Sequence, residues 1–326
     1  MNRRTSTSCA PHVGVAVARR VLEDLSARLD MSLPSEARPG ADLWVRLRDR
    51  SPWPSAPPLL RAADGWIHPG PPTAWSTFTD MVVTLGAPPP TGDAGWPDLS
   101  ALTADAIDAE AAAWMLPAAA VRSTPARPDP VPDLTDSSIA DATVVVLGTA
   151  WAAPLVGHVL ALLGARVLKV DHPRRPDPFP LGRRLTPKQE RHAVDLGSER
   201  DRDRFLALLV DADLLVDGHP PRVLDNAALD ARARASLVPR LSVVRVAAFV
   251  DSDRPGYGPA AEAHGGWAAR HDPPRLARSS VADPVAGLLG AIAAVDLLTA
   301  RAPGASARVS LEGAVAHLLD WEQRGV

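Results

Sequence analysis

Residues 143–173 read TVVVLGTAWAAPLVGHVLALLGARVLKVDHP, and this stretch determines the fold class. The apolar run at 143–148 is typical of a strand that is buried on both faces of a sheet. A helix at about 153–164 and a second strand at 166–170 follow it. Because strands that alternate with helices through short connections form parallel sheets, the stretch predicts one unit of an α/β fold.

The remainder of the second half continues this alternation. Further strands are expected in AVDL (193–196), LLVD (214–217), LSVVRVAAF (241–249) and ARVSL (307–311). Further helices are expected from Ser198 to about Leu209, around 222–236, from Asp283-Pro284 to about Ala300, and from Glu312 to Trp321. We therefore predict a parallel, Rossmann-like sheet flanked by helices over residues 138–326.

The first half has a different organisation. Residues 1–50 contain an amphipathic pattern at 14–30 and predict an N-terminal helical segment. Residues 51–122 predict a small α+β domain, and residues 123–137 carry four prolines and several charges, which is typical of a linker. The chain is long enough for two such domains.

Within residues 51–122, turn and capping residues locate the elements. Asp64-Gly65 lies between two short apolar runs and indicates a hairpin. Thr73 is a candidate cap for a helix that ends near Leu85, with Gly86 as its terminating glycine. A second helix is expected at 103–116, and Trp66 and Trp75 are expected in the core of this domain.

Composition excludes several classes of partner and site. The formal net charge is -3, which argues against broad binding of nucleic acid or anionic membranes. We find no apolar run that reaches the length of a membrane span, about 18 residues. Cys9 is the single cysteine, so no disulfide can form within the chain, and we expect a cytoplasmic protein. The nine histidines are dispersed and predict no metal site.

Two common α/β functions lack their sequence motifs. The loop after the first strand carries Trp151 and Pro154 where a dinucleotide-binding loop needs glycines, although Asp171 stands where a ribose-binding acid would lie. No Walker pattern and no G-x-S-x-G nucleophile motif occur. We interpret Asp171 and Asp217 as strand-end residues in structural hydrogen bonds.

Asp283 is the candidate that remains. In VADPVAG, it is predicted as the N-cap of a core helix with Pro284 as the first helical residue, and capping alone would explain it. Gly287 and Gly290, however, give the first turns a small face that permits close approach of a ligand or another helix. The free N–H groups at a helix N-terminus also favour an anion.

Six segments in order resemble the class III CoA-transferases, the CaiB/BaiF family that includes formyl-CoA and carnitine-CoA transferases. The segments are TVVVLGTAWAAPLVGHVLALLGARVLKVDHP, ERHAVDL, DADLLVDGHPPRVLD, PRLSVVRVAAF, RPGYGPAAEAHGGW and VADPVAGLLGAIAAVDLLTA. The resemblance covers about 140–320. Residues 59–88 also resemble the small domain of that family, which usually follows the large one, so the segment order looks rearranged.

The resemblance implies an enzyme that moves CoA between an acyl-CoA and a carboxylic acid, with Asp283 as the catalytic nucleophile. It places Trp151, Ala153 and Pro154 along the CoA cleft. Lys169 and His172 would lie at the end of the second strand, and Arg191 would meet a phosphate. CoA is then a substrate, and no permanently bound cofactor is expected. The family forms interlocked homodimers, so a homodimer, or pairing with a related subunit, is expected here.

The chain departs from the family pattern at several positions. Gly218-His219 replaces an Asn-Phe pair, and Gly258 replaces an aspartate. The family's glycine-rich loop has no counterpart near 34–58. These departures leave open a catalytically weakened homologue that binds CoA or pairs with another subunit. An acyl-CoA racemase or isomerase is a further alternative, although Tyr257 stands where the racemases carry a catalytic histidine.

Overall fold

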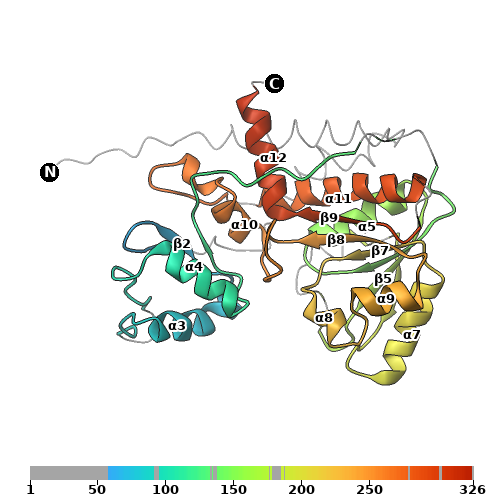
Figure 1. Ribbon diagram of the computed structural model, residues 1–326, viewed down its shortest axis with the longest axis horizontal. Coiled ribbons are helices and arrows are strands. Elements are labelled where there is room, and N and C mark those ends of the chain that lie inside the picture. The colour runs from blue at the N-terminus through green and yellow to red at the C-terminus, as the bar shows by residue number, and fades with distance from the viewer. Residues whose placement is uncertain are drawn as a thin grey trace.

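The structure is a computed structural model that describes residues 58–91, 95–132, 134, 138–175, 177, 185–186, 188–277, 280–300 and 303–324 (Figure 1). The expected helical segment at 1–50, and Cys9 within it, lie outside the described residues. Two sheets are present, a small one and a large one. The large sheet and its helices form the right-hand part of Figure 1.

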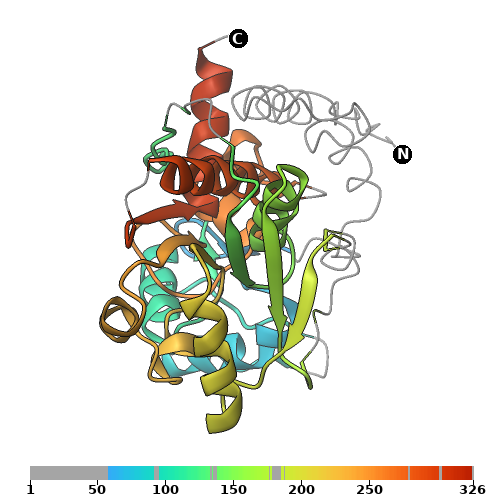
Figure 2. The ribbon, with the colours of Figure 1, turned by 90° about the vertical axis from the view of Figure 1, so that its right-hand side faces the viewer.

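The large sheet is parallel, as predicted, and its strand order is β6-β5-β4-β7-β8-β9 (Figure 2). Its strands are β4 (Thr143–Leu147), β5 (Arg166–Asp171), β6 (Glu190–Ala193), β7 (Leu214–Asp217), β8 (Ser242–Ala247) and β9 (Ser306–Ser310). From β4 the chain adds β5 and β6 on one side and then returns to add β7, β8 and β9 on the other. The direction of strand addition therefore changes between β4 and β7.

Helices cover both faces of this sheet. α5 (Ala152–Leu162) and α11 (Ala282–Thr299) pack on one face, where Val144 and Val146 of β4 point. α7 (Glu199–Val210) packs on the other face, where Val145 and Leu147 point. This alternation follows from the period of two along a strand, and it explains why β4 is apolar at every central position.

Two predicted elements in this half were placed wrongly. β6 spans Glu190–Ala193 and not 193–196, because Asp195 accepts the N–H of Gly197 and turns the chain away from the sheet. The helix expected around 222–236 is two helices, α8 (Arg222–Asp225) and α9 (Ala231–Leu237). Ala228 between them has a φ of 56°, and Asp230 caps α9 by accepting from Ala233 N.

α11 is the longest helix in the part of the chain that the structure describes. It has 18 residues and a mean hydropathy of 1.5, so by length and composition alone it could cross a membrane, and the expectation that no apolar run reaches that length was wrong. Most of its residues are nevertheless buried inside the fold. A Cβ at Gly287 would lie 2.7 Å from Leu155 of α5. The small face predicted for this helix thus permits close packing of α5.

The small sheet orders β1 (Leu60–Arg61), β2 (Trp66–His68) and β3 (Ala119–Ala120), and the predicted hairpin joins β1 to β2. Two helices, α3 (Trp75–Thr84) and α4 (Ala104–Ala113), pack against it. Its core consists of residues from all of these elements, among them Ile67, Phe78, Met81, Val82 and Ile107.

Three predictions about this part can be compared with the structure. Gly86 has a φ of 104° after α3, which confirms its predicted place at the helix end. Thr73 does not cap α3, because it lies inside a short 3-10 helix, η1 (Pro72–Ala74), and α3 begins after Ala74. Trp66 and Trp75 are only partly buried, so their placement in the core was wrong. Trp75 donates to Gly70 O and packs edge-on against Trp96.

The small sheet and its helices contact the large part through α10 (Gly258–His264), which touches β2 and β3 and also packs on α12 (Leu311–Gln323). Arg254 precedes α10, and its guanidinium donates to the carboxylate of Asp108 on α4 at 2.9 Å. Asp129, in the proline-rich segment, accepts from the N–H of Ser310 at 2.7 Å. The proline-rich segment is therefore attached to the start of α12 at this residue.

Candidate functional site

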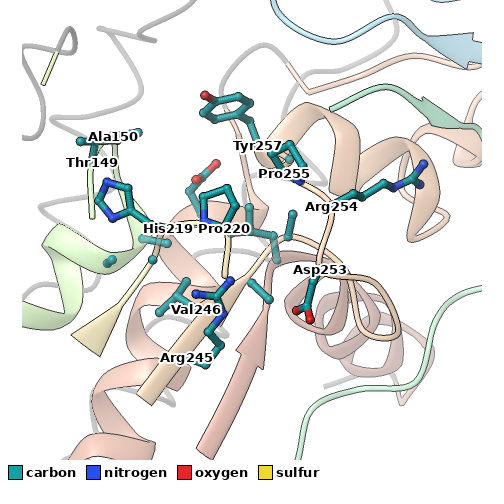
Figure 3. Close-up of a pocket in the computed structure, with 18 residues that line it drawn as sticks. Thr149, Ala150, His219, Pro220, Arg245, Val246, Asp253, Arg254, Pro255 and Tyr257 are labelled. Atoms are coloured by element: carbon teal, nitrogen blue, oxygen red, sulfur yellow. The ribbon is translucent and has the colours of Figure 1, made fainter. Parts of the chain in front are cut away.

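A cavity of about 180 Å³ lies at the carboxyl ends of β4, β7 and β8 (Figure 3). Loops after these strands supply Thr149, Ala150, His219 and Pro220, and β8 supplies Arg245. Asp253, Arg254, Pro255, Gly256, Tyr257, Asp283 and Leu311 complete much of its wall. The cavity therefore occupies the point where the direction of strand addition changes, which is where open α/β sheets bind ligands.

Small residues bring the strand ends and the start of α5 together beside this cavity. A Cβ added at Gly148 or at Gly218 would lie 2.7 Å from the Cβ of Ala153. Ala150 has a φ of 68°, and its N–H donates to Asp177 at 2.9 Å. Gly218, a departure from the family pattern, is thus required by the close approach of β4, β7 and α5.

Asp283 lies in the first turn of α11 and is only 9% exposed. The prediction that Asp283 is the N-cap was wrong, because α11 begins at Ala282, two residues earlier than predicted, and Val281 is the N-cap residue. The Asp283 carboxylate accepts hydrogen bonds from Ser280 and from the N–H of Gly258. Burial raises the pKa of Asp283 to about 6, although these hydrogen bonds act in the opposite direction.

Gly258 makes this arrangement possible. A Cβ at this position would lie 1.8 Å from Ser280 Oγ and 2.2 Å from Asp283 Oδ2. No side chain fits there while Asp283 and Ser280 keep their places. The loss of the aspartate that the family pattern has at this position is therefore coupled to the way Asp283 is held here.

Glu262 on α10 is the acidic residue of this region that the sequence analysis missed. Its side chain is 0% exposed and accepts from Val281 N at 2.8 Å and from Ala277 N at 3.2 Å. Burial raises the pKa of Glu262 to about 8. A single charged residue among the alanines of GPAAEAH was the signal that could have found it.

Arg245 and Asp217 form an ion pair at the end of the cavity nearest β7 and β8. Arg245 Nη1 lies 2.6 Å from Asp217 Oδ2, and His219 N donates to the same carboxylate at 3.1 Å. The prediction that Asp217 takes part in structural hydrogen bonds is confirmed. Figure 3 shows Arg245 below His219 and Pro220, with Arg254 and Tyr257 on the other side of the opening.

Among the residues predicted to bind CoA, Ala153 lines the cavity together with Asp283. Trp151 is the residue before α5 and Pro154 lies in its first turn, and both side chains are buried in the core beside the cavity. None of Lys169, His172 and Arg191 lines the cavity. The structure thus brings Ala153 to Asp283, whereas Lys169 lies on β5, His172 directly follows β5, and Arg191 lies on β6.

Lys169, Asp171 and Arg191 form a chain of hydrogen bonds. Lys169 is 2% exposed, and its ammonium group donates to Asp171 Oδ1 at 2.7 Å. Arg191 donates to Asp171 Oδ2 at 2.6 Å, and its side chain is 46% exposed. His172 Nε2 lies 3.3 Å from Asp195 Oδ1. The prediction of structural hydrogen bonds at Asp171 is confirmed, and the Arg191 guanidinium and the His172 imidazole lie at this edge of the sheet.

A second cavity, of about 630 Å³, lies between α4, α10 and α12. His264 Nδ1 lies 2.5 Å from Glu312 Oε1 and its Nε2 lies 3.4 Å from Asp108 Oδ2. Burial alone would lower the pKa of His264, but hydrogen bonds to these two carboxylates raise it to about 9. Arg254 lines both cavities, so this charged cluster adjoins the wall of the Asp283 cavity. Among the described residues, no three metal-ligating side chains cluster anywhere.

Comparison with known proteins supports one family. The model of CoA-transferase family III matches residues 139–323. The chain is similar to succinyl-CoA--D-citramalate CoA-transferase from Chloroflexus aurantiacus, with 28% identity over 49% of this chain and 45% of that protein. It is also similar to the succinyl-CoA--L-malate CoA-transferase beta subunit of that organism, with 28% identity over 48% of this chain and 44% of that one. The chain therefore spans about half the length of the curated relatives it matches.

The fold is also found in a solved structure. A hypothetical protein from Mycobacterium tuberculosis superposes with a TM-score of 0.50 at 22% identity, over 60% of this chain and 59% of that one. At this level of identity the similarity concerns the fold. It agrees with the parallel sheet and flanking helices described above.

Proposed function

This chain belongs to CoA-transferase family III, and on that premise we propose that it transfers CoA from an acyl-CoA to a carboxylic acid through a covalent intermediate on Asp283. The observation that carries this proposal is the buried carboxylate of Asp283, which lies on the wall of a cavity at the point of the sheet where the direction of strand addition changes. A carboxylate is a poor nucleophile in water, and removal from water increases its reactivity.

The proposed reaction proceeds in four exchanges. An oxygen of the Asp283 carboxylate attacks the thioester carbonyl, the C–S bond breaks, and CoA leaves as a thiolate with a mixed anhydride remaining. The thiolate attacks the Asp283 carbonyl and releases the donor acid, which gives an aspartyl-CoA thioester. The acceptor carboxylate attacks this thioester and expels the thiolate again. The thiolate then attacks the acceptor's carbonyl, which forms the new acyl-CoA and restores Asp283.

The size of the cavity limits what enters it. Its volume of about 180 Å³ is below the usual range of ligand pockets, about 300–1,000 Å³. We propose that only the acyl group and the thioester enter, while the rest of CoA lies outside. Ala153 would line the path of the thioester, and Trp151 and Pro154 would fix the start of α5 beneath it.

We propose that the phosphates of CoA meet the sheet edge where the Arg191 guanidinium and the His172 imidazole lie. Arg191 is partly exposed and held by Asp171, and a planar guanidinium can bind phosphate through two hydrogen bonds. Lys169 is buried and would act through Asp171, whose orientation it fixes. No permanently bound cofactor enters this proposal.

The names of the two curated relatives suggest the class of acyl group. Both are named for succinyl-CoA and a carboxylic acid acceptor. Arg245 lines the Asp283 cavity, and an acyl chain that ends in a second carboxylate could pair with it. We propose a dicarboxylic acyl-CoA as donor. The second relative is named as a beta subunit, which favours pairing with a related subunit, with a homodimer as the alternative. We also propose a cytoplasmic location.

The test is mass spectrometry of the intact protein after incubation with a panel of acyl-CoAs and hydroxylamine, for the natural chain and for Asp283→Ala. Hydroxylamine converts an aspartyl-CoA thioester into a hydroxamate. We expect a hydroxamate on Asp283 that is absent in the variant. If CoA binds by calorimetry but no donor gives an adduct, the transferase proposal is wrong for that panel, and the catalytically weakened homologue replaces it.

A further inference from the structure

Two buried carboxyl groups share one serine behind the Asp283 cavity. The Ser280 side chain hydrogen-bonds to the carboxyl groups of Asp283 and Glu262, and its Oγ also accepts the backbone N–H of Asp283 at 3.4 Å. Ser280 is 6% exposed and Glu262 is 0% exposed, and neither lines the cavity. The hydroxyl of Ser280 therefore connects the proposed nucleophile to a carboxyl group that substrate does not reach.

A count of hydrogens restricts the protonation of this group. A serine hydroxyl carries one hydrogen, so it can donate to only one of two ionised carboxylates. The second carboxylate would then face a lone pair of Ser280 Oγ inside the protein, which is unfavourable. A proton on one carboxyl removes the conflict, because that acid donates to Oγ while the hydroxyl donates to the other carboxylate.

The surroundings indicate that the proton belongs to Glu262. Among the residues that the structure describes, no cationic side chain is bonded to Glu262, and its polar neighbours are Ser280 and the backbone N–H groups of Ala277 and Val281. Burial raises the pKa of Glu262 to about 8, whereas that of Asp283 rises only to about 6. Between these two values Glu262 is neutral and Asp283 is ionised.

Tyr257 and His264 are titratable groups near Glu262 and Asp283, and both lie away from the contact that Ser280 makes between the two carboxyl groups. Tyr257, whose pKa is raised by burial and by the charges of Asp177 and Asp283, lines the cavity. His264 is two residues after Glu262 on α10, so it points to the opposite side of the helix, where Asp108 and Glu312 hold it. The charge of Asp283 adds to the raised pKa of Glu262, after the larger effects of burial and of hydrogen bonds.

We infer that protonated Glu262 donates to Ser280 and that Ser280 donates to ionised Asp283, so that Glu262 and Ser280 are positioning residues for the nucleophile. The inference rests on the proposed function of Asp283. With the Gly258 N–H, this relay fixes the carboxylate so that one oxygen faces the cavity. Fixed orientation of a reacting group is a major source of rate acceleration.

Four variants test the relay. Ser280→Ala removes the bridge, and Glu262→Met keeps the approximate size of the side chain but deletes its polar atoms. Glu262→Gln retains an N–H donor for Ser280 and an acceptor for Val281 N. Asp129→Asn is the matched control, since Asp129 also accepts from a serine hydroxyl and a backbone N–H at a helix start, in this case Ser310.

The main readout is the single-turnover rate of hydroxamate formation on Asp283, with acyl-CoA affinity measured separately. We expect Ser280→Ala and Glu262→Met to slow the step by about 10- to 100-fold with unchanged affinity, the usual effect of losing a hydrogen bond to a charged group. Glu262→Gln should stay within about 3-fold of the natural rate. In the natural chain we expect this rate to fall near pH 8, where Glu262 loses its proton, and in Glu262→Gln we expect no such fall. Asp129→Asn should match the natural chain. The inference would be overturned if Ser280→Ala and Glu262→Met fold and form the hydroxamate as fast as the natural chain does. It would also be overturned if Glu262→Gln forms it as slowly as Glu262→Met does.

A second readout does not depend on activity. In protein labelled with ¹³C at the glutamate carboxyl carbon, the resonance absent from Glu262→Gln belongs to Glu262. We expect it to titrate near pH 8. A midpoint near its ordinary value, about 4.3, would overturn the relay. If the natural chain forms no adduct, the proposed function fails, and this titration still decides whether the relay exists.

Discussion

Gly258 lies against the carboxylate of Asp283 so closely that a Cβ at residue 258 would stand 2.2 Å from Asp283 Oδ2. The same Cβ would stand 1.8 Å from Ser280 Oγ. Both residues lie at the start of α11, where Asp283 is in the first turn and Ser280 precedes the N-cap residue Val281. The absence of a side chain at residue 258 is therefore part of the candidate site, because it lets a backbone N–H reach the carboxylate.

We expect Gly258→Ala to slow acylation of Asp283 by at least about 100-fold and to destabilise the protein by about 1–3 kcal/mol, the usual cost of overpacking. Urea denaturation and hydroxamate trapping measure the two effects. The control is Gly95→Ala, since a Cβ at this exposed glycine meets nothing closer than 3.3 Å. If Gly258→Ala acylates Asp283 at the rate of the natural chain, Asp283 is not held in the way described.

The acylation rate should depend on the ionisation of Asp283. Because burial raises the pKa of Asp283 to about 6, we expect the single-turnover rate to rise tenfold per pH unit below that value and to level off above it. The measurement is hydroxamate formation between pH 4.5 and pH 7.5. A rate that stays constant down to pH 4.5 would contradict the assignment of the buried carboxylate as nucleophile.

His264 should make stability depend on pH. Its pKa is raised to about 9, so the stabilisation is complete below about pH 6.5, the ordinary value, and is lost as pH rises through about 9. We expect His264→Gln to lose about 1–3 kcal/mol of unfolding free energy at pH 6 and to match the natural chain at pH 10. Urea denaturation at both pH values measures this. An equal loss at both pH values would mean that the ion pairs with Asp108 and Glu312 do not contribute.

The ion pair of Asp108 with Arg254 connects α4, which packs on the small sheet, to the wall of the Asp283 cavity, so we expect its loss to affect acyl-CoA binding. Asp108→Asn leaves the buried Arg254 guanidinium without its ionised partner, which costs about 3–5 kcal/mol when such a pair is broken. Because Arg254 also lines the Asp283 cavity, we expect KM for acyl-CoA to rise by about 3- to 10-fold. Steady-state kinetics below the melting temperature measures it, and Asp105→Asn, at an exposed residue that pairs with Arg122, is the control. An unchanged KM would mean that the small sheet and its helices do not affect the binding of acyl-CoA at the site.

The sequence predicted the sheet better than it predicted the site. In strands such as 143–147 and 214–217, three or more consecutive residues are apolar because both faces are covered, and this pattern is local. Asp283 was visible because an acidic residue before proline opens a long apolar helix. Glu262 was not, because its contacts with Ala277 and Val281 arise only when α10 packs against α11, and no local pattern encodes that packing.

The charged cluster was invisible for the same reason, since Asp108 and Arg254 are 146 residues apart. Errors in single elements had local causes. The Asx turn at Asp195 ended β6 early, and the left-handed backbone of Ala228 divided one expected helix into two. In both cases a side-chain or backbone preference of one residue overrode the apolar pattern.

Arg245 should determine which acyl groups react. Its guanidinium lines the Asp283 cavity and is held by Asp217, so the distal carboxylate of succinyl-CoA would meet a fixed cation. We expect Arg245→Gln to reduce kcat/KM for succinyl-CoA by about 10- to 100-fold and to change kcat/KM for butyryl-CoA, which lacks that carboxylate, by less than about 3-fold. Arg240→Gln, at an exposed position, is the control. Because Arg245→Gln also leaves Asp217 without its partner, the double variant Arg245→Gln/Asp217→Asn removes the unpaired charge and should show the same loss of discrimination. Equal losses of kcat/KM for both acyl-CoAs would mean that Arg245 supports the fold and does not bind the distal carboxylate of the substrate.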